Sequence, residues 1–216
     1  SEVGAQAEVV MVMVATDAQV RDVVAGSGLI DRLAPNSVIC VASSISPETC
    51  RELATMAAAK DIGLLDTPVV LGQEAANNGT MTIYVGGDDA AVARARPVLS
   101  AFGRQVLHVG EVGAGQIAKT LNNTLLWACM SANMEVLGLA KRLGVDVPRL
   151  IEALQQGSGA NWSLSRWGKS TGKWAEKDMD VALELAQAAK MPMPLAALVD
   201  QLMKGVNQER MRALLS

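Results

Sequence analysis

The chain has 216 residues, half of them apolar, and a formal net charge of −3 at pH 7, which suits one full domain with a buried core and part of a second. A slightly negative charge, few aromatic residues and no basic run argue against nucleic acid as a partner. The sequence contains no apolar stretch near the ~20 residues of a membrane span and no signal peptide, so we expect no membrane partner.

Short β-branched runs alternate with alanine-rich helical stretches up to about residue 110. This alternation is typical of an α/β sheet. One of the intervening helices has a clear start, with Ser46 as N-cap and Pro47 at the first helical position. The runs predict strands at 9–14, 38–42, 64–70, 81–85 and 106–109, the last of them short and buried.

Beyond Gly115 the pattern is helical almost throughout, with breaks at Gly144, at 156–159 and around 192–194. We therefore predict an α/β protein with two domains. Residues 1–110 form a partial Rossmann-type parallel sheet, and residues 111–216 form an all-helical domain that opens with a long helix. Apolar residues recur along that helix at helical spacing, which predicts that it contributes to a homodimer or a higher homo-oligomer. They are Trp127, Met130, Met134 and Leu137.

Lys119 and Asn123 lie four residues apart near the start of this long helix, so their side chains share one face. Together they could hold an alcohol or carbonyl oxygen, with Asn123 fixing its orientation and Lys119 supplying the acid or base. The preceding glycines permit a tight turn into the helix. We expect the positive end of the helix dipole, with partial burial, to lower the pKa of Lys119. A solvated lysine and asparagine on an exposed face is the alternative.

The same segment, G-A-G-Q-I-A from Gly113, also satisfies a dinucleotide fingerprint, with Glu135 at the distance of a ribose-binding carboxylate. We interpret this match as accidental. A true fingerprint needs a second strand that ends at the acidic residue, whereas residues 116–143 keep a helical period without a turn.

Other candidate residues favour structural roles. His108 is the sole histidine, so it cannot form a multi-histidine metal site, and we predict no metal. Asp88 and Asp89 precede a helix and are predicted to cap it. Trp162, Trp167 and Trp174 could line a pocket or a subunit contact, or could be structural. The three cysteines are scattered in apolar surroundings, which fits reduced thiols and a cytoplasmic location.

The pattern G-x-G-x-x-x-K-x-x-N-N that opens the long helix resembles the β-hydroxyacid dehydrogenases, the family of 3-hydroxyisobutyrate dehydrogenase and tartronate semialdehyde reductase, with a helical domain of the 6-phosphogluconate dehydrogenase type. Three further stretches agree in order and spacing. Residues 43–47 resemble the family's S-T-I-x-P turn, and residues 66–85 resemble its D-A-P-V-S-G-G segment and the strand that follows. Lys177 and Asp178 match its K-D pair.

The resemblance implies reversible hydride transfer between NAD or NADP and the carbinol carbon of a small 3-hydroxy acid or related carbonyl compound. Lys119 would be the catalytic lysine and Asn123 its partner at the substrate. Ser44 would lie by the nicotinamide ribose, and Lys177 would contact the cofactor from the helical domain. Ser43 and Gly72 would belong to the substrate site.

Two departures from the family pattern matter. Val70 and Leu71 stand where the family has serine and glycine for the substrate carboxylate, which suggests a different or larger substrate, or simply a strand that extends into the core. In addition, nothing corresponds to the family's opening strand and G-x-G-x-x-G turn, so about 60 residues, roughly two βαβ units, are expected to be absent.

These departures leave open a second hypothesis, that the chain is a catalytically inactive, truncated family member acting as a dimeric binding or structural protein. A third, acyl or phosphoryl transfer, lacks a nucleophile motif or a phosphate loop. The choice between NAD and NADP cannot be read from the sequence, because no residue at the end of a second fingerprint strand is present.

Overall fold

A computed structural model describes residues 6–170 and 172–215. The chain divides into two compact units, Ser1–Lys119 and Thr120–Ser216, and we describe each by itself. The division falls within helix α5 (Ala114–Arg142). The domain boundary expected at 110/111 stays a prediction.

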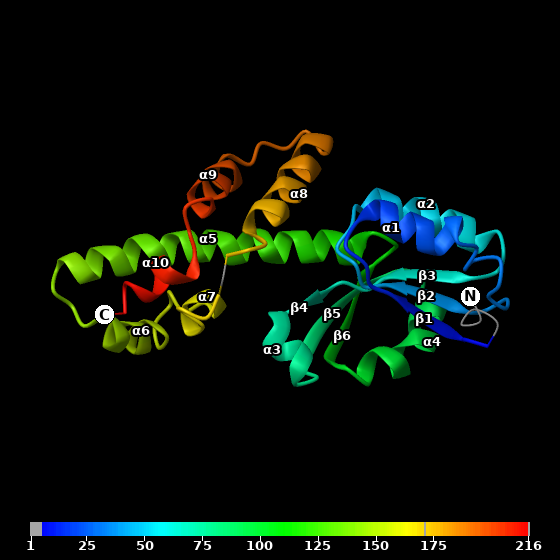
Figure 1. Ribbon diagram of the computed structural model, residues 1–216, viewed down its shortest axis with the longest axis horizontal. Helices are drawn as coiled ribbons and strands as arrows, with labels where there is room; N and C mark the ends of the chain where they lie inside the picture. Colours follow the sequence, from blue (N-terminus) through cyan, green and yellow to red (C-terminus); the bar gives the residue numbers. More distant parts are fainter. Residues whose placement is uncertain (1–5, 171, 216) are drawn as a thin grey trace. The chain divides into compact units, whose positions relative to one another are not determined.

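The described part of the first unit contains one six-stranded sheet, coloured from blue to green in Figure 1. The strands are β1 (Val9–Val12), β2 (Val38–Val41), β3 (Gly63–Asp66), β4 (Val69–Val70), β5 (Met81–Gly86) and β6 (Gly103–Gly110). Strands β1, β2 and β3 pair in parallel, as do β5 and β6, whereas β5 runs antiparallel to β3 and β4. This parallel-rich sheet confirms the predicted α/β fold class.

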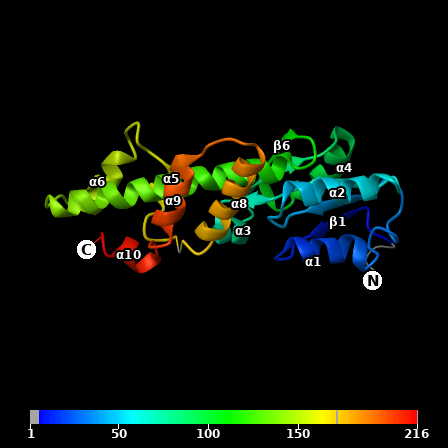
Figure 2. The same ribbon diagram turned by 90° about the horizontal axis from the view of Figure 1, so that it is seen from above.

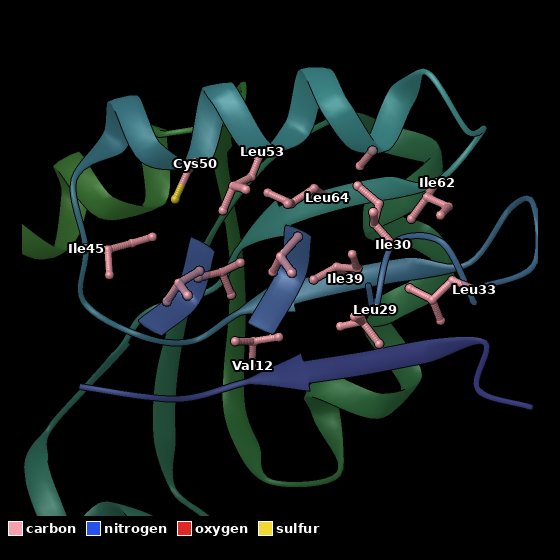
Figure 3. Close-up of a cluster of buried hydrophobic side chains, with 14 residues drawn as sticks. Val12, Leu29, Ile30, Leu33, Ile39, Ile45, Cys50, Leu53, Ile62 and Leu64 are labelled. Carbon is pink, nitrogen blue, oxygen red and sulfur yellow. The ribbon is translucent and has the colours of Figure 1, made fainter. Parts of the chain in front are cut away.

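Helices cover both faces of this sheet (Figure 1). They are α1 (Asp17–Arg21), the π-helical turn η2 (Asp22–Gly26), α2 (Pro47–Ala58), α3 (Gly72–Asn77) and α4 (Asp89–Ser100). Side chains of β2 alternate between the faces. Ile39 and Val41 belong to the apolar cluster beneath α2, most of which is drawn in Figure 3, whereas Val38 and Cys40 pack on the other face in the cluster that includes α4. The full burial of β2 explains its continuous apolar run.

The capping residues read from the sequence are confirmed. The Ser46 hydroxyl accepts a hydrogen bond from the Glu48 N–H at 3.2 Å, and Pro47 is the first residue of α2. The Asp88 carboxylate accepts from the Ala91 N–H at 2.9 Å at the start of α4. Local side-chain chemistry therefore fixes where these two helices begin.

Two strand predictions need correction. Residues 64–70 do not form one strand, because β3 ends at Asp66 and β4 starts at Val69, with Pro68, which has no N–H to donate, between them. Strand β6 exists but is not buried: Leu107 is 41% exposed and Val109 42%. Since β6 pairs with β5 alone, it lies at an edge of the sheet.

The second unit is helical throughout its described elements, as predicted. They are the remainder of α5, α6 (Val147–Leu154), α7 (Trp162–Ser165), α8 (Ala175–Ala188), α9 (Pro194–Met203) and α10 (Gln208–Arg212). The predicted break after α5 occurs at Gly144, whose φ of 75° suits glycine. Figure 2 shows α8 and α9 beside each other, and these helices contact one another. Among the described residues, no helix is long and apolar enough to cross a membrane.

The α5 face that was expected to form a homodimer is used inside this unit. Trp127, Met130 and Leu137 are at most 5% exposed, and Met134 packs against the same apolar cluster, which includes residues of α8, α9 and α10. This face of α5 is apolar, as the sequence predicts, but other helices of the same unit cover it. Other residues of α5 leave large apolar side chains exposed, namely Leu121, Leu125, Val136 and Leu139.

Candidate functional site

The start of α5 is organised around the carboxylate of Asp66, which is fully buried at the end of β3. Its Oδ1 accepts a hydrogen bond from the Gly113 N–H at 2.6 Å, and its Oδ2 accepts from the Gln116 N–H at 2.7 Å. These donors belong to the first turn of α5 and the residue before it, where backbone N–H groups otherwise lack partners. Asp66 therefore supplies the acceptor oxygens for the N–H groups at this helix terminus.

Burial raises the pKa of Asp66, and the N–H donors of Gly113 and Gln116 offset part of that rise. The space around the carboxylate is tight. A Cβ at Gly115 would lie 2.8 Å from Oδ2 of Asp66 and 2.9 Å from its carbonyl oxygen. The G-A-G turn therefore does not fit a dinucleotide pyrophosphate, because Asp66 already binds its N–H groups. In addition, Glu135 lies within helix α5 rather than at the end of a strand, so the fingerprint match is accidental, as predicted.

Gln116 joins this helix start to the loop after β2. Its side chain is 2% exposed. The Nε2 group donates to the Ser43 carbonyl oxygen at 2.7 Å, and Oε1 accepts from the Ile45 N–H at 3.2 Å. Both ends of one amide thus bind the two residues that flank Ser44. The loop carrying Ser44 and the helix carrying Lys119 are fixed to each other within the first unit.

Lys119 is the sixth residue of α5 and is half-buried. Its Nζ donates to the Val69 carbonyl oxygen at 2.7 Å, which places the ammonium group at strand β4. The effect of the helix dipole on the pKa of Lys119 stays a prediction. This contact holds Lys119 in place rather than leaving it directed into open solvent.

Asn123 follows one turn later on the same helix and is 7% exposed. Its Nδ2 donates to Oδ2 of Asp178 at 2.8 Å, and its Oδ1 accepts from Nδ2 of Asn122 at 3.0 Å. The same Oδ2 accepts from the indole Nε1 of Trp127 at 3.0 Å. Asp178, the aspartate of the K-D pair, thus contacts Asn123, the residue that the sequence predicts at the substrate.

The remaining predicted site residues differ in accessibility. Ser44, Gly72 and Lys177 are exposed. Ser43 is instead 2% exposed, and its hydroxyl accepts from the Val14 N–H at 2.7 Å, so its hydrogen bonds hold the loop. Its place at the substrate stays a prediction. Gly72 has a φ of 73°, and a Cβ there would meet nothing within 4 Å. Backbone conformation, rather than crowding, accounts for this glycine.

Leu71, beside Gly72, has a φ of 82°, a conformation that costs a residue with a Cβ about 1–2 kcal/mol. Its side chain is 37% exposed, whereas Val70 is buried at 5%. Of the two apolar replacements in this segment, Val70 therefore extends into the core and Leu71 does not. Both follow directly on Val69, whose carbonyl oxygen binds Lys119.

Other candidates have structural contacts. Nε2 of His108 lies 2.8 Å from the Gly87 carbonyl oxygen, in keeping with the structural role predicted for it. Trp167 is buried and donates to the Met211 carbonyl oxygen. The cysteines are free thiols, and burial raises the pKa of Cys40 to about 12. Within the described residues, no group of histidine, cysteine, aspartate and glutamate is arranged to hold a metal ion.

Sequence reasoning missed the roles of Gln116 and Trp127. A polar residue in the first turn of the helix, next to the glycines that bring it close to the sheet, was the available signal for Gln116, since a buried amide must find partners. Apolar periodicity predicts a dimer contact for Trp127. It carries no information on the partner that a buried indole N–H needs. The family motifs include Asp66 and Asp178, but the sequence predicts no contact for either residue.

Comparisons with known proteins agree with this arrangement. Residues 1–110 match the model of the NAD-binding domain of 6-phosphogluconate dehydrogenase, and residues 113–214 match the NAD-binding model of NADP-dependent 3-hydroxyisobutyrate dehydrogenase. A 3-hydroxyisobutyrate dehydrogenase of Pseudomonas aeruginosa is 38% identical, over 91% of this chain and 72% of the relative. An NAD-dependent L-serine dehydrogenase of the same organism is 34% identical, over 79% of this chain and 63% of that relative.

The crystal structure of 3-hydroxyisobutyrate dehydrogenase from Salmonella typhimurium superposes with a TM-score of 0.80 at 26% identity, covering 99% of this chain and 80% of that one. Fold and comparisons together define an NAD(P)-dependent oxidoreductase of the hydroxyacid dehydrogenase type, with NAD or NADP as cofactor. The chain belongs to the β-hydroxyacid dehydrogenase family.

Proposed function

We propose that this protein oxidises a small 3-hydroxy acid, or reduces the matching carbonyl compound, with Lys119 as the general acid and base. The observation that carries the proposal is the hydrogen bond from Nζ of Lys119 to the Val69 carbonyl oxygen at 2.7 Å. It holds a half-buried ammonium group one helical turn from Asn123, on the same face of α5.

In the direction of oxidation, the neutral amine of Lys119 takes the proton from the substrate hydroxyl. A bound NAD(P)+ would supply the acceptor for the hydride that leaves the carbinol carbon. Asn123 holds the reacting oxygen by a hydrogen bond. In the reverse direction, the Lys119 ammonium returns the proton to the carbonyl oxygen. Ser44, on the loop that Gln116 fixes, and Lys177, on α8, are proposed to contact the cofactor.

The substrate is proposed to carry an alkyl group rather than an amino group beside its carboxylate. Leu71 supports this preference, because its half-exposed apolar side chain stands next to the strand that anchors Lys119. An apolar wall cannot satisfy an ammonium group that has been taken out of water. The relatives act on both kinds of compound, since one is a 3-hydroxyisobutyrate dehydrogenase and another an L-serine dehydrogenase.

Kinetics of K119A in the complete protein test the proposal. We expect turnover to fall by 10²- to 10⁴-fold, the usual share of general acid–base catalysis, with cofactor affinity nearly unchanged. The control is K141A, which removes a lysine from the last turn of the same helix. A K119A variant that keeps more than about a tenth of wild-type kcat would remove this lysine from the mechanism.

We also propose a homodimer or higher homo-oligomer that uses the exposed apolar residues of α5, and a cytoplasmic location. Leu125 and Leu139 are 68% and 59% exposed, which is unusual for large apolar side chains on one helix. The location is supported by the cysteines, all of which are free thiols, as expected in a reducing compartment.

A further inference from the structure

The carboxylate of Asp178 binds two consecutive turns of α5 at once. Its Oδ2 accepts from Nδ2 of Asn123 at 2.8 Å and from Nε1 of Trp127 at 3.0 Å. Asn123 and Trp127 are four residues apart and therefore lie on one face of the helix. Asp178 reaches them from the first turn of α8.

The indole of Trp127 holds Oδ2 of Asp178 in one position. The indole is 5% exposed and belongs to the apolar core of the helical unit, where its neighbours restrict the ring. An indole N–H can only donate and an ionised carboxylate can only accept, so this hydrogen bond has one possible direction. The position of Oδ2 is therefore set by a rigid donor before Asn123 is considered.

A fixed acceptor selects one orientation of the Asn123 amide. The oxygen and nitrogen of an asparagine amide have nearly the same shape, so packing alone does not distinguish the two flipped states. With Nδ2 toward Asp178, a charge-assisted hydrogen bond forms. With Oδ1 toward Asp178, two acceptor oxygens would lie against each other. The hydrogen bond from Asn122 to Oδ1, at 3.0 Å, requires the same orientation.

We propose that Asp178 is a positioning residue, which fixes the amide of Asn123 so that Oδ1 and the second N–H of Nδ2 keep constant directions toward the substrate. The inference rests on the proposed role of Asn123 in holding the reacting oxygen. Asp178 itself acts only through Asn123. Its neighbour Lys177 is exposed.

Nuclear magnetic resonance tests the contact without any need for activity. The chain has four tryptophans and hence four indole N–H signals, and W127F identifies that of Trp127. We expect D178N to shift this signal and the side-chain amide signals of Asn123, while the other three indole signals stay in place. The matched control is D180N, an exposed aspartate two residues further along α8. Unchanged Trp127 and Asn123 signals in D178N would overturn the proposed contact.

A double-mutant cycle then separates positioning from general support of the fold. In the complete protein we expect D178A to lower kcat about tenfold in the wild-type background and by less than twofold when Asn123 is already alanine. D178N keeps an acceptor oxygen and should recover most of the loss. Equal losses from D178A in both backgrounds would overturn the proposal, because they would show that Asp178 does not act through Asn123.

The two proposals fail in different ways. If N123A keeps wild-type kcat, the proposed function of Asn123 is wrong, even when the resonance data support its contact with Asp178. If N123A is impaired but D178A and D178N match the wild type, the proposed function stands and the positioning role is wrong. If D178A does not fold, the resonance shifts of Trp127 and Asn123 in D178N decide, because D178N is expected to keep most of kcat.

Discussion

The side-chain amide of Gln116 donates to the Ser43 carbonyl oxygen at 2.7 Å, although 73 residues separate the two in sequence. The other end of the amide accepts from the Ile45 N–H. One buried side chain thus connects the loop after β2 with the first turn of α5. Ser44, which lies between the two contacted residues, is expected to depend on Gln116 for its position.

Replacing Gln116 with leucine should destabilise the protein markedly. The two side chains have similar size, but Q116L leaves the Ser43 carbonyl and the Ile45 N–H buried without partners, at about 1–3 kcal/mol for each such group. We expect the free energy of unfolding to fall by about 2–4 kcal/mol in urea titrations. Q105L, at an exposed glutamine of β6, is the control and should change little. A stable Q116L would show that this contact does not hold the loop.

The contribution of Asp66 should depend on pH with an unusual sign. Burial raises its pKa above the ordinary 3.8, so the folded state binds this proton more tightly than the unfolded state does. The stability that Asp66 contributes is therefore complete below that ordinary value and is lost as the pH rises through the folded-state pKa. We expect the advantage of wild type over D66N in urea unfolding to be larger at pH 3 than at pH 7. An advantage that grows with pH would contradict the expectation.

The left-handed backbone conformation of Leu71 should lower the stability of the protein. Its left-handed conformation strains a residue with a Cβ and suits glycine, and its side chain is half-exposed, so little burial would be lost. We expect L71G to raise the free energy of unfolding by about 0.5–1 kcal/mol. L71A is the matched control, because it removes most of the side chain but keeps the Cβ and the strain. Equal effects of the two variants would rule out backbone strain as the cause.

A charge on the exposed apolar side of α5 should abolish the proposed dimer. L125D places a carboxylate where an apolar contact between two copies would need to be dry. By light scattering at micromolar concentration, we expect the wild type to be at least dimeric and L125D to be monomeric. M56D, at an exposed methionine of α2, should leave the assembly intact. A monomeric wild type at this concentration would refute the proposal.

The chain of residues 1–216 taken alone should bind NADH and NADPH too weakly to detect at micromolar concentration. Its sequence has no G-x-G-x-x-G turn, and Asp66 occupies the similar turn before α5. Losing several charge-assisted hydrogen bonds, each worth ~1.5–3 kcal/mol, weakens binding by powers of ten. Calorimetric titration measures this, and a micromolar Kd would show that the cofactor binds elsewhere.

Patterns confined to one element were sufficient for part of this structure. Ser46 with Pro47, Asp88 and Gly144 mark helix ends through their own backbone chemistry, so their roles were legible in the sequence. Leu71 was not, because nothing local requires a leucine to adopt a left-handed conformation. The roles of Gln116 and Asp178 depend on partners 50 or more residues away, which only the folded chain brings together. The face of α5 that carries Trp127 was recognised as apolar, but periodicity does not tell whether the same chain or a second copy covers it.

The contact between Asp66 and the turn at Gly115 also limits how this sequence can evolve. A methyl group at position 115 would collide with the carboxylate, and a longer or apolar residue at position 66 would leave the N–H groups of the turn without their acceptor. A random library at either position should therefore return almost only the present residue. Varying both positions together should not relax this limit, because the same methyl group would also lie 2.9 Å from the Asp66 carbonyl oxygen and 3.0 Å from that of Tyr84, which no change of side chain removes.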